Sequence, residues 1–511
     1  GYRVSVKSAV ETQDGDKMCY SEDTEMLTAS GWKPVAEVSL NDSVASLNQA
    51  GEIEYLLPVA THKFPHTGPM YSLETTQVSL LVTDNHKLYV KKRYASQYTG
   101  RPYELAEARD MLGKRFKMKR DGVWKGTTPD YFTFPAIQVD AGQFGRGVRM
   151  IPAKKITTKA YLMLLGMFLS EGNTFCEQNG NYGMDIHQTI PANRAKAIRA
   201  LNEAGIQFTE CDAKFRLYGL QLYTHFKQFG KCWEKYIPSE VFNYASEDLK
   251  ILYDWLMWGD GHVDKQGSST YSTTSDRLAN DFQRLALHIG WSVNIETRPP
   301  SRGFIKGKEY DFRACHRLQV YRSKNEPEIN SSKSSKREKN KEQMIANPGE
   351  FVYCVTLPRN HVLYVRRKGK PVWCGNSGRH GNKGIITIVP DHQMPVGEDG
   401  KPFEVLVSPY TLSSRQNASQ IAELALGKLA AKHGKPYEIP DFHLPDLVKF
   451  AHEELGRHGE KSTETLYDPV TRTKIPNVLT GNQFFMKLHH LVEQKLKQRD
   501  VGGYDSFGSP A

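Results

Sequence analysis

The chain has 511 residues, with 68 Lys and Arg against 57 Asp and Glu and a formal net charge of +11. Its length predicts about three domains, and its basic charge favours a nucleic-acid partner over an ordinary solvated surface. No stretch reaches the roughly 20 uninterrupted apolar residues of a membrane span, and the first residues lack the pattern of a secretion signal, so we expect no membrane association.

The seven cysteines are odd in number, widely scattered and without a CxxC pair. Neither a disulfide framework nor a zinc site is indicated. We therefore expect a reducing, cytoplasmic compartment.

Two kinds of periodicity follow one another along the chain. Residues 19–135 alternate apolar and polar positions in short runs broken by Gly, Asn and Asp, which predicts strands. Residues 150–322 show helical periodicity with strand-rich stretches between. The helical pattern occurs twice in the same order, with one apolar helix ending at Glu171 and the other at Asp260, each followed by Gly. This repetition predicts a duplicated α+β domain.

Strand alternation returns at residues 350–376, after a stretch rich in Ser, Lys, Glu and Asn at 323–349. The polar stretch has little to bury and is predicted to be a flexible linker. The sequence thus predicts a multidomain chain in which an all-β domain, 19–135 with 350–376, is interrupted by the α+β domain.

The two ends read as one continuous sequence when residues 19–376 are removed. Joining 1–18 to 377–511 gives "GDKMSGRHGNKGIITIVP", which resembles the active-centre loop of the β subunit of multisubunit RNA polymerases. "VLVSPYTLSSRQNASQIAELALGKLAAKHG" resembles a downstream region of that subunit. The resemblance implies that Lys17 and Lys383 lie near the initiating nucleotide and the RNA 3′ end, with other polymerase subunits, template DNA and RNA as partners. Surface lysines in a generic glycine-rich loop are the alternative.

The removed segment resembles an intein. "CYSEDTEMLTASGWKPVAEVSLNDSV" matches the first motif of that family, "LVTDNHKL" the Thr-x-x-His motif, and "FVYCVTLPRNHVLYV" with "VWCGNS" the terminal motifs. The resemblance implies a horseshoe-like all-β splicing (Hint) domain that needs no cofactor.

In that family a cysteine such as Cys19 attacks the preceding carbonyl to form a thioester, because a thiolate is a strong nucleophile near neutral pH. Thr83 and His86 polarise this first scissile bond, and an imidazole can both accept and deliver a proton at cellular pH. Ser377 then takes the acyl group. Asn376 cyclises, since only its carboxamide reaches its own carbonyl in a five-membered ring.

Two departures from the family pattern bear on this interpretation. Gly375 replaces the usual penultimate histidine, and Cys354 replaces a common aspartate. His361 matches the family histidine and is expected to carry the proton transfers that Gly375 cannot. Cys354 is compatible with a relay nucleophile, but the inteins that use such a cysteine usually lack the one at Cys19, so we interpret it as an accessory thiol.

The helical part resembles LAGLIDADG homing endonucleases in "LLGMFLSEG" and "YDWLMWGDG". The resemblance implies cleavage of double-stranded DNA at the insertion site, with Glu171 and Asp260 as Mg²⁺ ligands over the scissile phosphates. The two helices would pack through the small residues Ser170 and Gly259. Lys235 matches a lysine thought to assist catalysis, and an ordinary solvated lysine is the alternative.

Each acid alone would read as a helix end before a glycine cap. Leu169 and Trp255 depart from the family pattern, so a splicing element with an inactive nuclease stays open. A nucleic-acid-binding polymerase segment with an inert insertion is the third reading. The basic and aromatic side chains of the intervening strands would line a DNA groove or cover a sheet; they include Lys214, Arg216, Tyr218 and Tyr223.

Overall fold

The computed structural model describes residues 19–58, 60–93, 98, 102–140, 148–177, 181–265, 267–305, 308–330, 341–358, 360–375, 389–407, 419–434 and 447–482. The chain is multidomain and mostly β, with several antiparallel sheets. It divides into two compact units, Lys17–Gly381 and Gly1–Asp16 with Asn382–Ala511. Each unit is described by itself.

The first sheet of the larger unit mixes strands from its two ends. Its six strands run in the order β27-β7-β8-β1-β28-β6. They are β1 (Tyr20–Ser21), β6 (Ala60–Pro65), β7 (Pro69–Glu74), β8 (Ser79–Thr83), β27 (Lys341–Ala346) and β28 (Phe351–Thr356). Tyr20 pairs with Val82 on one side and with Tyr353 on the other. The first described strand therefore lies inside the sheet.

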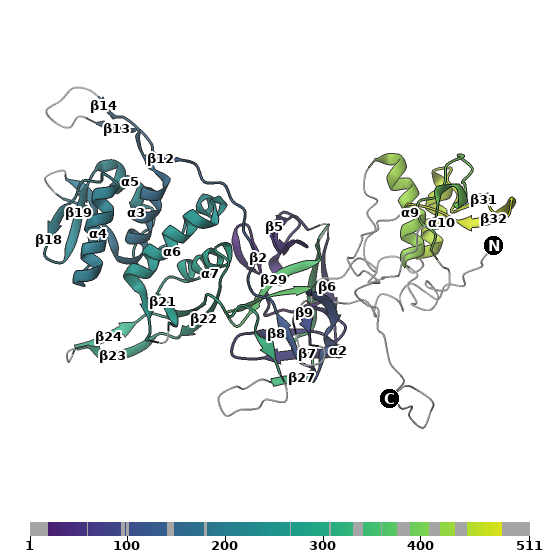
Figure 1. Cartoon of the computed structure of the whole chain (residues 1–511), viewed down its shortest axis with the longest axis horizontal. Coiled ribbons are helices and arrows are strands. Elements are labelled where there is room, and N and C mark those ends of the chain that lie inside the picture. The colour runs from purple at the N-terminus through teal and green to yellow at the C-terminus, as the bar shows by residue number, and fades with distance from the viewer. Residues whose placement is uncertain are drawn as a thin grey trace. The chain divides into compact units, whose positions relative to one another are not determined.

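The second sheet is built in the same way from early and late strands, in the order β3-β2-β29-β4-β5, with β30 paired to β29 (Figure 1). They are β2 (Glu25–Thr28), β3 (Gly31–Pro34), β4 (Val44–Leu47), β5 (Ile53–Leu56), β29 (Val362–Arg367) and β30 (Lys370–Gly375). All six residues of β29 are buried, because the strand is covered on both faces.

A smaller sheet, in the order β10-β9-β11-β26, completes the β-rich part. It contains β9 (Lys87–Lys92), β10 (Glu104–Glu107), β11 (Phe116–Met118) and β26 (Glu328–Ile329), and the short helix α2 (Ala108–Met111) follows β10.

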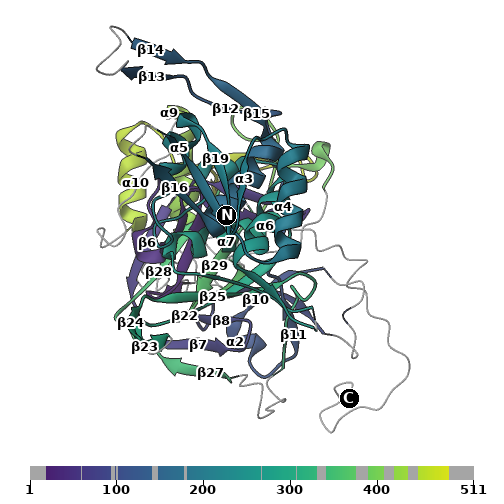
Figure 2. The same cartoon turned by 90° about the vertical axis from the view of Figure 1, so that its left-hand side faces the viewer.

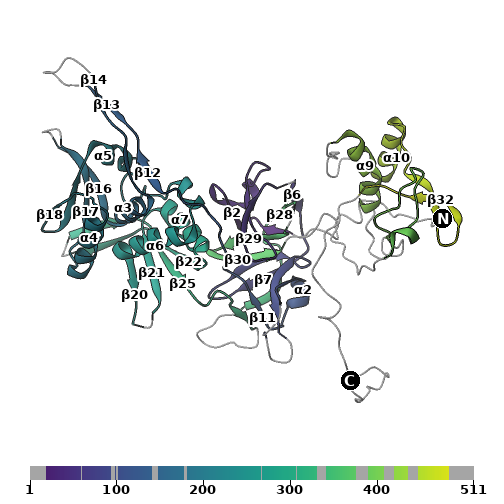
Figure 3. The ribbon, with the colours of Figure 1, turned by 45° about the horizontal axis from the view of Figure 1, so that its top comes forward.

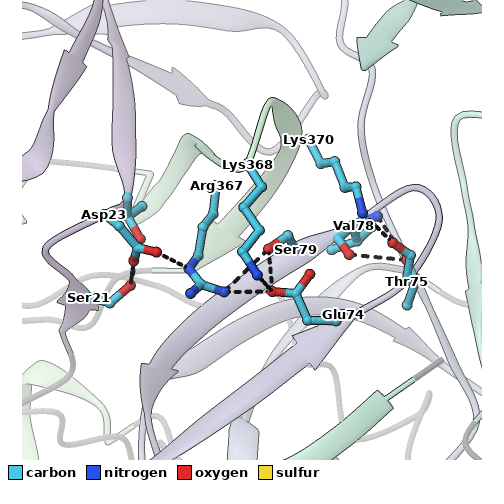
Figure 4. A network of polar contacts seen from close by, with 10 residues as sticks. Ser21, Asp23, Glu74, Thr75, Val78, Ser79, Arg367, Lys368 and Lys370 are labelled. Carbon is cyan, nitrogen blue, oxygen red and sulfur yellow. Dashed lines mark hydrogen bonds and ion pairs between the residues drawn. The ribbon is translucent and has the colours of Figure 1, made fainter. Parts of the chain in front are cut away.

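Ion pairs fasten the turn between β29 and β30 to the early strands (Figure 4). Arg367 donates to Asp23 at 2.7 Å and to Glu74 at 2.6 Å, and Lys368 donates to Glu74 at 2.8 Å. Arg367 is only 8% exposed, so the network is screened less than a surface pair would be. It ties the last two strands of the unit to its first segments.

The prediction of a flexible linker at 323–349 is wrong for the parts of it that the structure describes as strands. β26 pairs with β11, and β27 pairs with β7 along six positions from Lys341↔Glu74 to Ala346↔Pro69. Tyr71 donates a hydrogen bond to Glu342 at 2.5 Å. The neighbouring strand supplies the hydrogen bonds and the packing that this polar stretch does not supply by itself.

The helical part contains two halves that share one order of helices and strands, apart from α5 at the end of the first (Figure 3). The first half runs α3 (Thr158–Glu171), β16 (Gly172–Cys176), β17 (Tyr182–His187), α4 (Pro191–Glu203), β18 (Thr209–Cys211), β19 (Lys214–Tyr218) and α5 (Leu220–Lys227). The second runs α6 (Ser246–Asp260), β20 (Gly261–Val263), β21 (Ser269–Thr273), α7 (Asp276–His288), β22 (Ser292–Arg298) and β25 (Cys315–Tyr321). The sheet orders β16-β17-β19-β18 and β20-β21-β25-β22 correspond strand for strand.

The second half carries an additional hairpin, β23 (Ser301–Ile305) with β24 (Lys308–Phe312), between β22 and β25 (Figure 2). Helix α3 begins at a capping residue, Thr157, whose hydroxyl accepts from the Ala160 amide at 3.2 Å. The helix is apolar on nearly all sides because it is the central element of the core.

The predicted boundary of the β-rich part at residue 135 differs from the structure. β12 (Tyr131–Phe134) pairs with β15 (Lys154–Thr157), and Phe134 belongs to the core around α3. Phe132 stacks on Tyr161 with 3.6 Å between ring centroids. A second hairpin, β13 (Ile137–Asp140) with β14 (Val148–Ile151), occupies the gap that the prediction left between the two domains.

Buried hydrogen bonds join the helical part to the β-rich part. The Gly369 carbonyl, in the turn between β29 and β30, accepts from the Ile295 amide at 3.0 Å and from the Gln283 side chain at 3.1 Å. Arg120 is fully buried; it donates to the Pro371 carbonyl at 2.9 Å and to the Asn294 side chain. The interface between the two parts therefore contains buried polar groups that are hydrogen-bonded across it.

The smaller unit packs α9 (Ser419–His433) against α10 (Leu447–Arg457) beside the hairpin β31 (Thr463–Asp468) and β32 (Thr473–Leu479). Among the helices that the structure describes, none has the length and apolar character needed to cross a membrane.

Candidate active sites

The first candidate site lies at the start of β1. Cys19 is fully buried, and its amide donates to the Thr83 hydroxyl at 3.0 Å. The Thr83 amide in turn donates to the Cys19 carbonyl at 3.0 Å. Since the Cys19 nitrogen belongs to the Met18–Cys19 peptide bond, the Thr83 hydroxyl touches the bond that the thiol would attack.

His86 lies in the turn between β8 and β9, three residues after Thr83. Its amide donates to the Thr83 carbonyl at 3.0 Å, and its carbonyl accepts from the Ala108 amide at 2.8 Å. The buried ring meets Tyr20 edge-on, with 4.4 Å between centroids. The Thr-x-x-His motif is therefore a turn whose two side chains both reach the first residues of β1.

Cys354 lies across from Cys19. The register Tyr20↔Tyr353 and Ser21↔Val352, continued by one residue, places these cysteines opposite each other, and both belong to one apolar cluster. A hydrogen bond from Cys19 lowers the pKa of the Cys354 thiol, and His62 on the neighbouring strand acts in the same direction. One thiolate is thus stabilised within the pair.

The end of β30 lies next to the start of β1. Gly375 is the last residue of β30, and its carbonyl accepts a hydrogen bond from the Tyr20 hydroxyl at 3.0 Å. Asn376 is the next residue of the chain. Residues adjoining the two predicted junctions are therefore in direct contact although 355 positions separate them.

The neighbouring Cys374 is a third thiol close to this contact. Burial raises its pKa to about 12. It stays protonated at neutral pH and does not compete as a nucleophile.

The glycine that replaces the usual penultimate histidine is required by packing. A Cβ atom at Gly375 would overlap the Lys87 carbonyl and the Leu105 side chain. A histidine cannot occupy this position without displacing β9.

His361 precedes the last pair of the β29–β30 ladder, Val362↔Gly375. Its φ of 49° lies in the left-handed region. Burial lowers its pKa, and its Nδ1 atom is buried without a hydrogen-bond partner among the described residues. A neutral imidazole thus lies one residue beyond the point where β30 ends.

Four predicted residues lie outside the described part of the chain: Asn376, Ser377, Lys17 and Lys383. Of the residues assigned to the first site, the structure brings together Cys19, Thr83, His86 and Cys354. Tyr20 was not predicted from the sequence, because nothing in its own neighbours signals its contact with Gly375.

The second candidate site lies where α3 and α6 end side by side. A Cβ atom at Gly259 would overlap Ser170, and one at Gly166 would overlap Trp255. The helices therefore approach closely through small residues, with Ser170 facing Gly259 as the motif predicts. Trp255, a departure from the motif, packs on Gly166.

Glu171 and Asp260 are the last residues of the two helices, and the pKa of each carboxyl is raised. Burial raises the pKa of Glu171, which Lys235 and His187 oppose. The surrounding protein and the Glu171 charge together raise the pKa of Asp260 to about 7. Two carboxylates that resist ionisation together are suited to a shared cation.

Lys235 is 3% exposed and not a solvated surface residue. Its ammonium donates to the Phe168 carbonyl at 2.6 Å and to the Gly172 carbonyl at 2.9 Å, so it caps the carboxyl end of α3. Burial lowers its pKa to about 8, against the opposing effects of Asp260 and Glu171. Its two hydrogen bonds hold the end of α3, where Glu171 lies.

These residues fit Mg²⁺, which takes one or two protein carboxylates and completes its shell with water and phosphate oxygens. Across the described parts of the chain, no group of three or more His, Cys, Asp or Glu forms a denser metal site. Of the basic residues predicted to line a DNA groove, Lys214 and Arg216 are paired with Asp185, at 2.6 and 3.0 Å, so part of their charge is neutralised. Tyr218 is 50% exposed.

Comparisons with known proteins find similarity in both units. Residues 319–508 match the family described as RNA polymerase Rpb2, domain 6, a range that begins upstream of Ser377. Residues 256–325 match a LAGLIDADG-like domain. A solved structure named as an AceL NrdHF class 3 split intein is 14% identical, covers 33% of this chain and 97% of its own, and has a TM-score of 0.16.

Three curated relatives are similar over different lengths. An RNA polymerase subunit beta C-terminal section from Stigeoclonium helveticum is 27% identical over 76% of this chain and 39% of its own length. An ATP-dependent Clp protease proteolytic subunit from Chlamydomonas moewusii is 32% identical over 54% and 28%. An RNA polymerase subunit beta from Mycoplasmopsis synoviae is 35% identical over 28% and 12%.

The chain thus spans well under half the length of each of these relatives. It combines similarity to RNA polymerase Rpb2, domain 6, over residues 319–508 with similarity to a LAGLIDADG-like domain over residues 256–325.

Proposed function

We propose that residues 19–376 excise themselves by protein splicing and join Met18 to Ser377. The observation that carries this proposal is the hydrogen bond from Tyr20 to the Gly375 carbonyl, which brings the residues next to both junctions together. Splicing needs this proximity because the acyl group must pass from one junction to the other.

The first step is attack of the Cys19 sulfur on the Met18 carbonyl carbon. The C–N bond breaks, a thioester forms, and His86 protonates the departing amide nitrogen while the Thr83 hydroxyl holds it. Cys354 is an accessory thiol that accepts a hydrogen bond from Cys19.

The next steps take place at the second junction. The Ser377 hydroxyl takes the acyl group and releases the Cys19 thiol. The Asn376 carboxamide then attacks its own carbonyl, which cleaves the bond to Ser377, with His361 in place of the usual penultimate histidine for proton transfer. The freed Ser377 amine finally converts the ester into a peptide bond with Met18.

A similarity between unrelated hosts supports an inserted element. The alignment with the Clp protease subunit extends over 291 residues, more than the 153 residues that lie outside 19–376. It therefore includes part of the proposed insert. We propose the host segments 1–18 and 377–511, a horseshoe-like splicing domain that contains β1 to β11 and β26 to β30, and an endonuclease domain that runs from β12 to β25.

The test is expression of the chain followed by mass spectrometry of the products. Splicing yields a 358-residue insert and a 153-residue joined product. Cys19→Ala prevents thioester formation, whereas Asn376→Ala lets branched or N-terminally cleaved chains accumulate. Cys232→Ala, at an exposed cysteine, is the matched control and splices normally. Persistence of the intact wild-type chain after long incubation contradicts the proposal.

We further propose that the helical part cleaves double-stranded DNA at the insertion site. The effect of the Glu171 charge on the pKa of Asp260, together with the close packing of the two helix ends, favours this second activity. Mg²⁺ bound by these two carboxylates would supply Lewis-acid stabilisation of the scissile phosphates. Lys235 holds the end of α3, and with it Glu171, in position.

The substrate for the second test is DNA encoding the uninterrupted "GDKMSGRHGNKG", with Mg²⁺. Glu171→Gln and Asp260→Asn are each expected to abolish cleavage. Asp254→Asn, an exposed acid on the same helix as Asp260 and paired with Lys250, leaves cleavage intact. Cleavage by Glu171→Gln excludes that residue from the site.

For the joined product we propose a place in an RNA polymerase β subunit, with the other polymerase subunits, template DNA and RNA as partners. The match of residues 319–508 to RNA polymerase Rpb2, domain 6, supports this.

A further inference from the structure

Tyr20 touches both halves of the first candidate site. It follows Cys19 directly, and its fully buried ring packs edge-on against His86 at 4.4 Å. Its hydroxyl donates to the Gly375 carbonyl at 3.0 Å. One side chain therefore contacts the residue proposed to act at the first junction and the backbone that leads into the second.

The Tyr20 hydroxyl is a donor in this contact, because a carbonyl oxygen can only accept. Burial raises the pKa of Tyr20 well above its usual value, and the nearby thiols of Cys374, Cys354 and Cys19 act in the same direction. The hydroxyl therefore keeps its proton through the pH range in which proteins fold.

The Gly375 backbone needs an external restraint. Its position excludes any side chain, since a Cβ atom would meet Lys87 and Leu105. A glycine has more conformational freedom than other residues, and Gly375 is the last residue of its strand. The hydrogen bond from Tyr20 holds the Gly375 carbonyl at the point where the described ladder ends.

We propose that Tyr20 is a positioning residue of the splicing reaction, whose hydroxyl orients the Gly375–Asn376 peptide and so aligns the second junction with Cys19. The inference rests on the proposed splicing function and adds a residue to it. Thioester formation at Cys19 does not depend on this hydrogen bond. Acyl transfer to Ser377 and cyclisation of Asn376 do, because both start from the backbone that it orients.

Tyr20→Phe tests the proposal, because it removes the hydroxyl and keeps the ring against His86. Tyr364→Phe is the matched control: the Tyr364 hydroxyl is also buried in the β-rich part and also donates to a backbone carbonyl, that of Arg120, at 3.0 Å. Each substitution therefore removes a buried hydrogen bond from a tyrosine hydroxyl to a backbone carbonyl, one near the junctions and one away from them.

Two reactions are measured in each chain. Added thiol cleaves the thioester at Cys19 and reports the first step. In a Cys19→Ala background, cleavage at the second junction reports Asn376 cyclisation alone. Tyr20→Phe is expected to slow the second reaction about tenfold and to leave the first within about twofold, as loss of one orienting hydrogen bond predicts. Tyr364→Phe leaves the ratio of the two rates at the wild-type value.

Replacing Tyr20 with p-aminophenylalanine restores a donor and is expected to recover most of the lost rate. Equal ratios in Tyr20→Phe and Tyr364→Phe overturn the inference, as does a Tyr20→Phe chain that no longer shows a cooperative thermal transition, since the hydroxyl would then serve folding in general. Absence of any splicing in the wild-type chain overturns the proposed function instead, so the two failures are distinguishable.

Discussion

Cys354 lies directly across the β1–β28 pair from Cys19 and accepts a hydrogen bond from its thiol. Both side chains belong to one small apolar cluster. The aspartate that the intein pattern usually has at this position can accept the same hydrogen bond.

Replacement of Cys354 tests this relationship. Cys354→Ala removes the acceptor and is expected to slow thiol-induced cleavage at Cys19 about tenfold, whereas Cys354→Asp restores an acceptor and much of the rate. Cys374→Ala, at a buried thiol whose pKa burial raises to about 12, leaves this rate unchanged. Complete loss of splicing in both Cys354 variants would instead make Cys354 an acyl carrier.

Introducing the usual penultimate histidine is expected to harm the protein. Gly375→His places side-chain atoms against the Lys87 carbonyl and Leu105, which destabilises the β30–β9 contact by about 1–3 kcal/mol and stops cleavage at the second junction. Thermal unfolding and product analysis measure both effects. Gly456→Ala, where nothing lies within 4 Å of the added Cβ, leaves stability unchanged or raises it. Faster splicing by Gly375→His would contradict the steric argument.

The contact between α3 and α6 predicts a pair of compensating substitutions. Gly259→Ala forces its Cβ into Ser170, so we expect a loss of about 1–3 kcal/mol in the free energy of unfolding and loss of DNA cleavage, since Glu171 and Asp260 move apart. Adding Ser170→Gly opens the space and recovers most of the stability. A double variant no better than Gly259→Ala would show that the helices meet elsewhere.

Acid is expected to weaken the packing of β12 on the helical part through His225. Burial among aromatic rings lowers the pKa of His225 to about 4, from an ordinary value near 6.5. The folded chain resists protonation of the ring, so the contribution to stability is complete above pH ~6.5 and is lost as the pH falls through about 4.

Denaturant titrations of the wild type and of His225→Gln measure this contribution. The stability advantage of the wild type should shrink by about 2 kcal/mol between pH 7 and pH 4. Tyr161→Phe removes the hydroxyl that contacts His225 at 3.2 Å but keeps the ring buried, so it retains the acid dependence. Parallel pH curves for the wild type and His225→Gln would refute the assignment.

Local motifs were enough to predict much of the two sites. The Thr-x-x-His spacing gives a turn that holds Thr83 and His86, and the small residues Ser170 and Gly259 do meet. The repeated helix-strand pattern corresponds to two sheets of the same strand order. These features could be predicted because they depend on residues close together in the sequence or on a pattern of helices and strands that occurs twice.

Other features depend on contacts that the sequence does not display. From the sequence, Gly375 was interpreted only as the absence of the usual histidine. The Lys87 carbonyl that excludes a side chain there belongs to a strand nearly 290 positions away, so the sequence does not display the reason. The residues of β27 were predicted to be a linker, because the hydrogen bonds that make them a strand come from β7, far away in the sequence. Tyr20 carried no signal, since its role lies in the distance to Gly375 and not in its own neighbours.

The shared interface of the helical and β-rich parts constrains how such an element could be shortened in evolution. Deleting the helical part would remove both donors of the Gly369 carbonyl and the Asn294 acceptor of the Arg120 guanidinium. Each loss would cost on the order of 1–3 kcal/mol wherever the remaining strands keep these groups from water. A shortened form of this chain is therefore expected to need new hydrogen-bond partners, or access to water, at positions 120 and 369.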